Sequence, residues 1–425
     1  MHPHLWHPYT QAKTALDPLK VKSGQGVWLE LESGKRLIDA ISSWWVNLHG
    51  HAHPKIAEAI YHQAKTLEQV IFAGFTHDPA EQLADRLIEK LPDNLNRVFY
   101  SDNGSTAVEV GLKMAYQYWA NLDRPRHTFL AFEGAYHGDT FGTMAVGGRS
   151  IFSSVFADLL FEVEYLPFPS TYWGDQTIAQ READLIAQIT EKLSQPDRYA
   201  GVIIEPLVQG VAGMQMCRSE FLQALRQVTQ AHATLLIFDE VMTGFGRTGD
   251  WFACLKAKVQ PDIICLSKGI TGGFLPLSVT ICTEEIYKAF YSDNPVHTLY
   301  HGHSYTANPL GCAAGLASWN LMQENQASFM GMETQHRQHL EQLQTHPKLE
   351  KLRVMGTIAA MDVVTPDRSG YLNQVGAKIR QQAIDRGVLL RPLGQVIYLM
   401  PPYCITDTEL AKIYETIADI LDCLN

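Results

Sequence analysis

Lys268 is the residue of this sequence whose type and position most directly suggest chemistry. It follows the apolar run 262–267, and Gly269, Gly272 and Gly273 come just after it. A continuous apolar run between helical segments is typical of a strand buried on both faces, and nearby glycines let other atoms approach the amine closely. A lysine at a strand end is ordinarily exposed to solvent. In a partly desolvated site, however, its pKa falls and the neutral amine can attack a carbonyl carbon.

Two acids, Asp239 and Glu240, stand at the end of another apolar run, 234–239. A carboxylate at a strand tip is a solvated loop acid, a metal ligand or the partner of a cation on a ligand. No His or Cys stands at metal-ligand spacing from this pair, which disfavours a metal. The sequence leaves the other two interpretations open.

The segment Asn103-Gly104-Ser105-Thr106 follows a third apolar run and opens a predicted helix. The backbone N–H groups of Gly104 and Ser105 would then lie at a helix N-terminus, which suits a phosphate group. Alternatively, Asn103 and Ser105 simply cap the helix. The motif alone does not decide between these interpretations.

The three segments together indicate pyridoxal phosphate, because each supplies one group that this cofactor needs. Lys268 would form the Schiff base, Gly104 and Ser105 would bind the phosphate, and Asp239 would pair with the pyridine nitrogen. Tyr136, in Glu133-Gly-Ala-Tyr-His-Gly-Asp139 after a further apolar run, can cover the face of the ring. Taken by itself, that segment also fits a polar turn with a buried tyrosine.

The elements that must position these residues alternate along the chain as in an α/β domain with a mostly parallel sheet. The predicted strands are 97–101, 127–132, 201–205, 234–239, 262–267 and 277–282. We expect a hairpin at 27–37, a helix at 78–91 that Asp78 caps, and a last helix opened by a capping box at Thr406 and Glu409. Both ends would join in a small α+β domain: residues 1–54 and 311–425 around a large domain at 55–310.

The composition narrows the kinds of partner. The net charge of −11 argues against a general nucleic-acid or anionic-membrane surface. No apolar run is long enough to span a bilayer, and the first residues lack the pattern of a signal peptide. The seven cysteines are scattered singly, which favours reduced thiols and a cytoplasmic protein. His49, His51 and His53 lie in a turn-like context and are expected to be polar loop residues rather than metal ligands.

The motifs resemble those of the class III (ω-amino acid type) aminotransferases, which have the type I pyridoxal-phosphate fold. The motifs that carry the resemblance are Asp102-Asn-Gly-Ser-Thr-Ala-Val-Glu, Tyr136-His-Gly-Asp-Thr, Ile204-Glu-Pro, Phe238-Asp-Glu, Thr243-Gly-Phe-Gly-Arg-Thr-Gly and Leu266-Ser-Lys-Gly, in the order of that family. The resemblance implies a homodimer with shared active sites, in which Gly302, His303 and Ser304 reach the cofactor phosphate of the partner subunit. The commoner family pattern there is Gly-Pro-Thr, so the role of the His303 side chain stays open.

The two chain ends resemble more narrowly the members of this family that act in biotin biosynthesis. The segments are Trp6-His-Pro-Tyr-Thr, Ile41-Ser-Ser-Trp-Trp, Arg391-Pro-Leu-Gly and Ile397-Tyr-Leu-Met-Pro-Pro-Tyr. Those enzymes move an amino group from S-adenosylmethionine to 8-amino-7-oxononanoate in a ping-pong reaction that yields 7,8-diaminononanoate. Met242 stands where many class III members carry Gln, and the biotin enzymes likewise lack that Gln.

The resemblance implies a substrate site at Tyr9, Trp44, Tyr136, Gly302 and Arg391, beside the catalytic lysine. The chemistry agrees, because an apolar chain with a terminal carboxylate needs aromatic walls and one bidentate cation. A sulfonium ion and a flat purine are likewise attracted to aromatic faces. Without the resemblance, Trp44 and Trp45 would be assigned to the core or to an interface.

Other functions have to be weighed against this hypothesis. Lysine as the amino donor, or a different class III reaction on an ω-amine, are the nearest alternatives. A regulator that kept the cofactor would usually carry a DNA-binding module, for which this chain has no room. Gly244, Gly246 and Gly249 match the dinucleotide fingerprint, but the context is wrong because four residues separate the strand from the first glycine. Arg247 is expected to support this loop, and Glu205 either assists the site or forms a structural ion pair.

Overall fold

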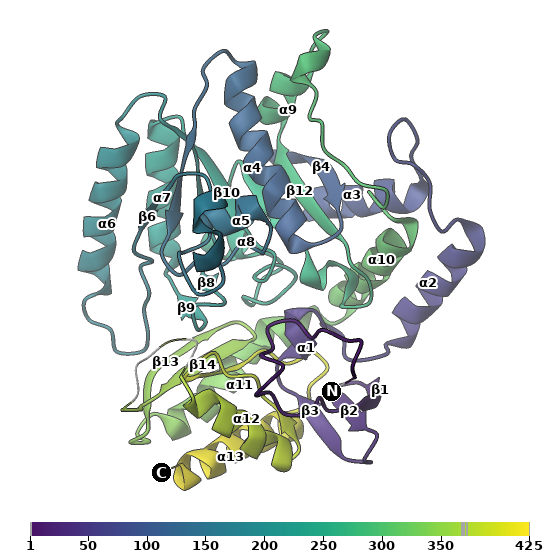
Figure 1. Ribbon diagram of the computed structural model, residues 1–425, viewed down its shortest axis with the longest axis vertical. Helices are drawn as coiled ribbons and strands as arrows, with labels where there is room; N and C mark the ends of the chain where they lie inside the picture. The colour runs from purple at the N-terminus through teal and green to yellow at the C-terminus, as the bar shows by residue number, and fades with distance from the viewer. Residues whose placement is uncertain (1, 367–369, 371–372, 425) are drawn as a thin grey trace.

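The computed structural model describes residues 2–366, 370 and 373–424. Figure 1 shows an upper part built around a large sheet and a lower part that holds both chain ends. Among the described residues, no helix combines the length and the apolar character that crossing a bilayer requires.

The central sheet confirms the predicted α/β fold with a mostly parallel sheet. All six predicted strands are present, and β12 alone runs antiparallel to its neighbours in the described sheet. The strand β6 was not predicted, because only its two end residues are fully buried. The strand order is β4 (Leu95–Ser101), β12 (Ser278–Thr283), β11 (Ile263–Leu266), β10 (Leu235–Asp239), β7 (Tyr199–Ile204), β5 (Thr128–Phe132) and β6 (Val163–Leu166).

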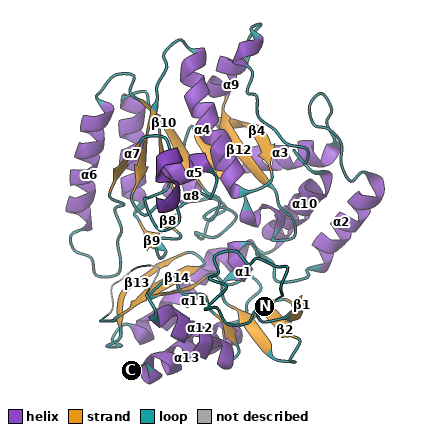
Figure 2. Cartoon of the chain, viewed as in Figure 1, coloured by secondary structure: helices purple, strands orange, loops and turns teal. Residues whose placement is uncertain are grey.

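The strands β10 and β11 are continuously apolar because helices cover both faces of the sheet (Figure 2). Successive side chains of a strand point to opposite faces. Phe238 therefore packs in the cluster that includes α7 (Ser219–Ala231), whereas Ile237 packs on the other face against α4 (Gly104–Asn121). The burial of both faces fixes where these strands end, and the reactive residues stand at those ends.

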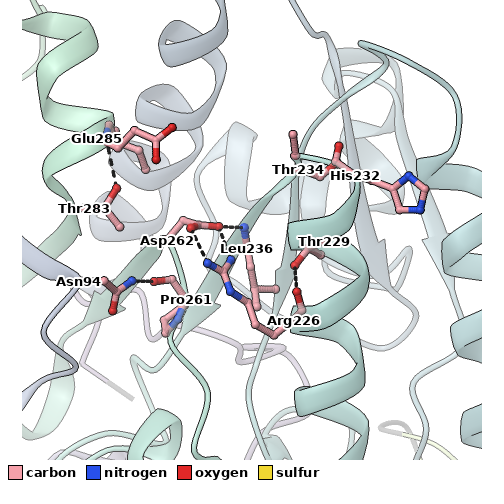
Figure 3. Close-up of polar contacts among 12 residues, drawn as sticks. Asn94, Arg226, Thr229, His232, Thr234, Leu236, Pro261, Asp262, Thr283 and Glu285 are labelled. Carbon is pink, nitrogen blue, oxygen red and sulfur yellow. Dashed lines mark hydrogen bonds and ion pairs between the residues drawn. The ribbon is translucent and has the colours of Figure 1, made fainter.

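Asp262 fixes the register of these strands at the opposite edge of the sheet (Figure 3). Its carboxylate accepts hydrogen bonds from Arg226 at 2.7 and 3.0 Å and from the backbone N–H of Leu236 at 2.7 Å. β10 and β11 then run parallel, so Asp239 and the segment leading to Lys268 emerge at the same edge.

The two ends of the chain meet in the lower part of the molecule (Figure 1). The predicted hairpin is confirmed, because β2 (Trp28–Leu31) pairs antiparallel with β3 (Arg36–Asp39), and β3 pairs parallel with β15 (Val388–Leu389). Three helices pack around a second sheet nearby. These elements are β13 (Leu349–Met355), β14 (Ile358–Val363), β16 (Val396–Leu399), α11 (Gln326–Leu343), α12 (Val375–Asp385) and α13 (Asp407–Cys423).

The helix ends give one confirmation and one correction. The capping box at Thr406 and Glu409 is present at the start of α13. The helix α3 (Asp78–Lys90) is also present, but the prediction that Asp78 caps it was wrong, because the side chain of His77 accepts the hydrogen bond from Ala80 N–H. The imidazole can do this because its unprotonated ring nitrogen is an acceptor.

The remaining elements are short or lie at the border between the two parts. The helix α10 (Pro309–Glu324) packs on α2 (Pro54–Thr66) and on α3, and the domain boundaries near residues 54 and 310 stay predictions. The other short elements are β1 (Val21–Gln25), α1 (Ser42–Trp45), α5 (Phe141–Val146), β8 (Val208–Gln209), β9 (Gln215–Met216), α8 (Ala253–Ala257), α9 (Glu284–Phe290) and the 3-10 turns Ser154–Leu159, Lys268–Thr271 and Pro295–His297. The longer helix α6 (Ile178–Leu193) packs against α7 in the large domain.

Candidate active site

A cavity of about 560 Å³ lies at the edge of the sheet where β10 and β11 end. Residues from the large sheet and from both ends of the chain line it, so neither part of the molecule encloses it alone. The predicted site residues on its wall are Tyr9, Trp44, Gly104, Ser105, Tyr136, Asp239, Lys268 and Arg391.

Lys268 lies on the wall of this cavity rather than on the outer surface. Its backbone is left-handed, with φ of 45°, and Gly273 follows at φ of 90° with no room for a side chain against Val46 and Asn47. The lysine amine lies 5.3 Å from the ring centre of Trp45. Burial lowers the pKa of Lys268, which the negative charges of nearby carboxylates only partly offset. The Lys268 amine is therefore easier to deprotonate, and so to use as a nucleophile, than a lysine amine in water.

Asp239 is buried and held in place by two neighbours. One carboxylate oxygen accepts a hydrogen bond from Val241 N–H at 3.0 Å, and the other lies 2.6 Å from Nδ1 of His137. Burial disfavours the charged imidazole, yet the hydrogen bond and charge of Asp239 outweigh it and raise the pKa of His137. His137 was not predicted as part of the site. Its place beside Tyr136 in a motif at a strand end was the available signal.

The second acid of the pair has a structural role. The carboxylate of Glu240 accepts hydrogen bonds from the N–H groups of Ala253 and Cys254 at 2.6 and 2.7 Å, which anchors the start of α8. Within the described residues, no three His, Cys, Asp or Glu side chains gather in a way that could hold a metal ion. Asp239 is therefore the acid of this pair that can serve a ligand.

Glu205 ties together two walls of the cavity. Its carboxylate accepts hydrogen bonds from the N–H groups of Tyr136 at 3.0 Å and Gly210 at 2.9 Å. Burial is the main reason that the pKa of Glu205 rises to about 7, and the nearby His137 opposes this rise. The residue thus positions the tyrosine that faces the cavity and the loop that begins at Gly210.

The start of α4 forms a cradle that can hold a phosphate group. Asn103 and Thr106 form a capping box, so the cap interpretation is correct for Asn103. Ser105 is different: its hydroxyl accepts a hydrogen bond from Asp139 N–H at 3.2 Å. A side chain at Gly138 would collide with the Ser105 hydroxyl, and one at Gly104 would come within 2.5 Å of the Val241 side chain. The first N–H groups of the helix remain accessible from the cavity because glycines leave this space open.

Aromatic side chains and one arginine form the outer part of the cavity. The hydroxyl groups of Tyr9 and Tyr136 lie 3.1 Å apart, and Tyr9 also donates a hydrogen bond to Asp139. The rings of Tyr9 and Trp44 meet edge to face at 5.4 Å, and the guanidinium of Arg391 lies 4.6 Å from the Trp44 ring centre. This end of the cavity suits an apolar chain that carries an anionic group.

Phe152 is a further aromatic residue of this cavity, and it was not predicted. Its ring contacts those of Tyr9 and Tyr136, each at 6.0 Å. A lone phenylalanine outside any recognised motif carries no sequence signal of such a role.

Gly302, His303 and Ser304 are absent from the residues that line this cavity in the described chain. The carbonyl oxygen of Ser304 accepts a hydrogen bond from Gln69 at 2.6 Å, and Nε2 of His303 lies 4.0 Å from Asp102. The structure therefore does not bring these three residues to the site of their own subunit. Their predicted role at the partner subunit's cofactor stays a prediction.

Arg247 supports the backbone around the cavity. Its buried guanidinium donates hydrogen bonds to the carbonyl oxygens of Pro401 at 3.1 Å, Trp45 at 3.3 Å and Asn47 at 3.4 Å. These bonds join the loop after β10 to both ends of the chain. They leave no contact of Arg247 with the cavity, from whose described lining it is absent.

Comparison with known proteins shows the family. The model of the family described as aminotransferase class III matches residues 9–421. The chain belongs to the class III aminotransferases. Adenosylmethionine-8-amino-7-oxononanoate aminotransferase of Synechococcus elongatus is 62% identical to this class III chain over 421 residues, 99% of each sequence.

Solved structures of other aminotransferases agree with this fold. Adenosylmethionine-8-amino-7-oxononanoate aminotransferase from Methanocaldococcus jannaschii matches with a TM-score of 0.89 and 33% identity, over 98% of this chain and 97% of that one. A pyridoxal-phosphate-bound amine transaminase from an uncultivated Pseudomonas species matches with a TM-score of 0.90 and 30% identity, over 99% of each.

Pyridoxal phosphate is the cofactor of this class III aminotransferase, as predicted. The cavity fits it on independent grounds. The cradle at Gly104 and Ser105 has the open backbone that a phosphate needs, Asp239 supplies a buried acceptor, and the amine of Lys268 is available as a nucleophile.

The raised pKa of His137 predicts a pH-dependent contribution to stability. Because this pKa lies above the ordinary value of 6.5, protonated His137 stabilises the fold fully below pH 6.5, and the effect is lost as the pH rises through the folded-state value. His137→Gln should therefore lower the thermal unfolding temperature of the cofactor-free protein more at pH 6 than at pH 9.

His336→Gln is the matched control for this measurement. His336 is also buried and hydrogen-bonded, but burial lowers its pKa to about 4, so it is neutral at both pH values. At pH 6 the unfolded chain, with its ordinary histidine pKa of 6.5, binds the proton that folded His336 does not, so the loss of unfolding temperature should be smaller at pH 6 than at pH 9, the opposite trend to His137→Gln. Equal losses at both pH values for His137→Gln would contradict the assigned ion pair.

Proposed function

We propose that this aminotransferase transfers an amino group from S-adenosylmethionine to 8-amino-7-oxononanoate and so forms 7,8-diaminononanoate in biotin biosynthesis. The proposal is supported by the full-length similarity to enzymes named adenosylmethionine-8-amino-7-oxononanoate aminotransferase. The observation in the site that carries it is Arg391 stacked on Trp44 at the aromatic end of the cavity.

Both proposed substrates suit the shape and charge of this cavity. The acceptor has an apolar chain that aromatic walls can cover, and its terminal carboxylate can form a bidentate ion pair with Arg391. The donor has a sulfonium ion and a purine, which Tyr9 and Trp44 attract through their ring faces. The same aromatic surface can thus bind two unlike substrates in turn, as a ping-pong reaction requires.

Lys268 is the proposed catalytic residue. It would hold the cofactor's aldehyde group in the resting enzyme until the amine of the incoming substrate replaced it. Its freed amine would then accept the proton from the carbon that carries the amino group and return it during the transfer. The lowered pKa of Lys268 favours the neutral base. Bound pyridoxal phosphate supplies an electron-withdrawing ring that stabilises the negative charge left on that carbon.

The other residues hold the cofactor in the orientation that this proton transfer needs. Asp239, fixed by His137, would accept a hydrogen bond from the pyridine nitrogen and keep it protonated. Gly104 and Ser105 would bind the phosphate at the start of α4. Tyr136 would cover the face of the ring, and the hydrogen bond from its backbone N–H to Glu205 fixes its position.

We also infer a homodimer whose subunits complete each other's sites. Gly302, His303 and Ser304 lie outside the cavity of their own chain, as expected for residues that serve the partner subunit. Tyr300, just before them, is 73% exposed, and Trp6 is 94% exposed, which suits burial between two subunits.

The seven cysteines are all free, which supports a cytoplasmic location.

An assay that varies the amino donor tests the proposed function. Purified enzyme with pyridoxal phosphate should form 7,8-diaminononanoate from 8-amino-7-oxononanoate when S-adenosylmethionine is the donor, measured by mass spectrometry. Lysine is the comparison donor, and 4-aminobutyrate with 2-oxoglutarate tests the other class III chemistry. If lysine but not S-adenosylmethionine supported product formation, S-adenosylmethionine would be ruled out as the donor. If the enzyme transferred an amino group only from 4-aminobutyrate to 2-oxoglutarate, the whole proposal would be refuted.

Arg391→Ala should weaken acceptor binding more than cofactor binding. We expect KM for 8-amino-7-oxononanoate to rise about 10- to 100-fold, because a hydrogen bond to a charged group is worth about 1.5–3 kcal/mol. Steady-state kinetics measures this, and the visible absorbance of the enzyme should stay unchanged.

Arg380→Ala is the matched control for this substitution. Arg380 lies close enough to Arg391 for the latter to lower its pKa, although burial is the larger cause, and it does not line the described cavity. Its removal should therefore leave KM for the acceptor within about threefold of the wild-type value. Equal increases in the two variants would show that general positive charge, rather than a direct contact, attracts the substrate.

A further inference from the structure

One wall of the cavity is a tight loop, residues 210–214, between the short strands β8 and β9. Val211 of this loop lines the cavity. The loop closes on itself, since the N–H groups of Gly213 and Met214 both donate to the carbonyl oxygen of Gly210 at 3.2 and 2.9 Å. Gly213 and Met214 have left-handed backbones, with φ of 94° and 52°. The carbonyl groups of these two residues are not used inside the loop.

The large domain holds the first residue of this loop. Gly210 N–H donates to Glu205 at 2.9 Å. A side chain at Gly210 would come within 3.2 to 3.3 Å of Met242 and Trp45, so the loop lies tightly against the wall that also carries Lys268. This contact leaves the far end of the loop to be fixed by another element.

Arg353 of β13 holds that far end from the small domain. Its guanidinium donates to the carbonyl oxygens of Met214 at 2.8 Å and Gly213 at 2.5 Å. A third hydrogen bond goes to Lys351 O at 2.6 Å, and Asp362 of β14 lies 2.8 Å away as an ion pair. Figure 1 shows β13 and β14 directly below β8 and β9, across the boundary between the two parts of the molecule.

Arg353 and Asp362 form a buried ion pair, and burying two charges is energetically costly. Arg353 is 2% exposed and Asp362 is 4% exposed. Removing two charges from water costs several kcal/mol per ion, which attraction and hydrogen bonds must offset. The planar guanidinium can bind two carbonyl groups and one carboxylate at once, and a lysine ammonium cannot reproduce that fork.

We propose that Arg353 is a positioning residue that fixes the 210–214 loop as a wall of the substrate cavity and thereby controls acceptor binding. The inference rests on the proposed function, since it takes 8-amino-7-oxononanoate as the acceptor. Arg353 touches neither Lys268 nor the phosphate cradle. Its effect is therefore on substrate binding rather than on the reaction at the cofactor.

Arg353→Lys tests the proposal with the least damage to the fold. The lysine keeps the charge opposite Asp362 but loses the fork to Gly213 and Met214. KM for 8-amino-7-oxononanoate should rise about tenfold, because ordering the released loop would then draw on the free energy of acceptor binding, while kcat should change less than about threefold. The absorbance of bound pyridoxal phosphate should be unchanged. A wild-type KM, or a fall in kcat at constant KM, would overturn the proposal.

Arg226→Lys is the matched control, because Arg226 also forms a bidentate pair with an aspartate, Asp262, but at the opposite edge of the sheet (Figure 3). It should lower thermal stability without raising KM. If Arg226→Lys raised KM as much as Arg353→Lys, the effect would be a general consequence of weaker stability, and the proposal would fail.

Gly213→Ala displaces the same loop without changing any charge. The φ of 94° disfavours alanine, and its Cβ would come 2.9 Å from Val396. Gly213→Ala should also raise KM for the acceptor about tenfold. If Arg353→Lys does not retain the cofactor, Gly213→Ala serves as the test of the proposal in its place. An unchanged KM in this variant would count against the proposed wall.

Assay of the wild-type enzyme separates this inference from the proposed function. If the wild type transfers no amino group to 8-amino-7-oxononanoate, the proposed acceptor is wrong. The KM comparison is then made with the amino acceptor that the wild type does use, and a role for Arg353 in forming the cavity still predicts the rise.

Discussion

The buried carboxylate of Asp239 is the interaction on which the site depends. An isolated charge at this depth would cost several kcal/mol, so the chain must supply partners for it. Val241 N–H and His137 do so from two different segments, and His137 becomes easier to protonate as a result. The same negative charge opposes the loss of basicity that burial imposes on Lys268. The charge of Asp239 thus acts against burial at both His137 and Lys268 and raises the pKa of each relative to burial alone.

The geometry of the sheet explains why this carboxylate and the lysine are neighbours. Strands β10 and β11 are parallel and adjacent, so their carboxyl ends meet at one edge, where open α/β sheets bind ligands. That edge provides only one side of a cavity. The small domain supplies the other side, through Trp44 and Arg391 from opposite ends of the chain and through the bonds of Arg353 to the 210–214 loop.

Much of this arrangement follows from the sequence because its physical signals are local. Continuous apolar runs predict strands buried on both faces, and Lys268 and Asp239 stand at the ends of two such runs. The position of Tyr9 in the cavity could be expected only from the resemblance to class III enzymes, since no local pattern carries it across the fold.

The residues that sequence reasoning missed act through tertiary contacts. His137 matters because the fold brings it to Asp239, and the ring of His77, which caps α3, is held at Nε2 by the carbonyl oxygen of Ala307. Arg353 lies in a strand with Glu and Lys neighbours, so the sequence suggests an exposed arginine. Its burial against the 210–214 loop depends on how the two domains meet, which no local pattern encodes.

The covalent attachment of the cofactor to Lys268 is the central claim, and borohydride reduction tests it most directly. Reduction of the wild-type enzyme with bound pyridoxal phosphate should fix the cofactor to the chain, and peptide mass spectrometry should find the adduct on Lys268. Lys268→Ala should show no adduct and no steady-state turnover. An adduct on another lysine of the wild type, or near-normal turnover of Lys268→Ala, would contradict the account.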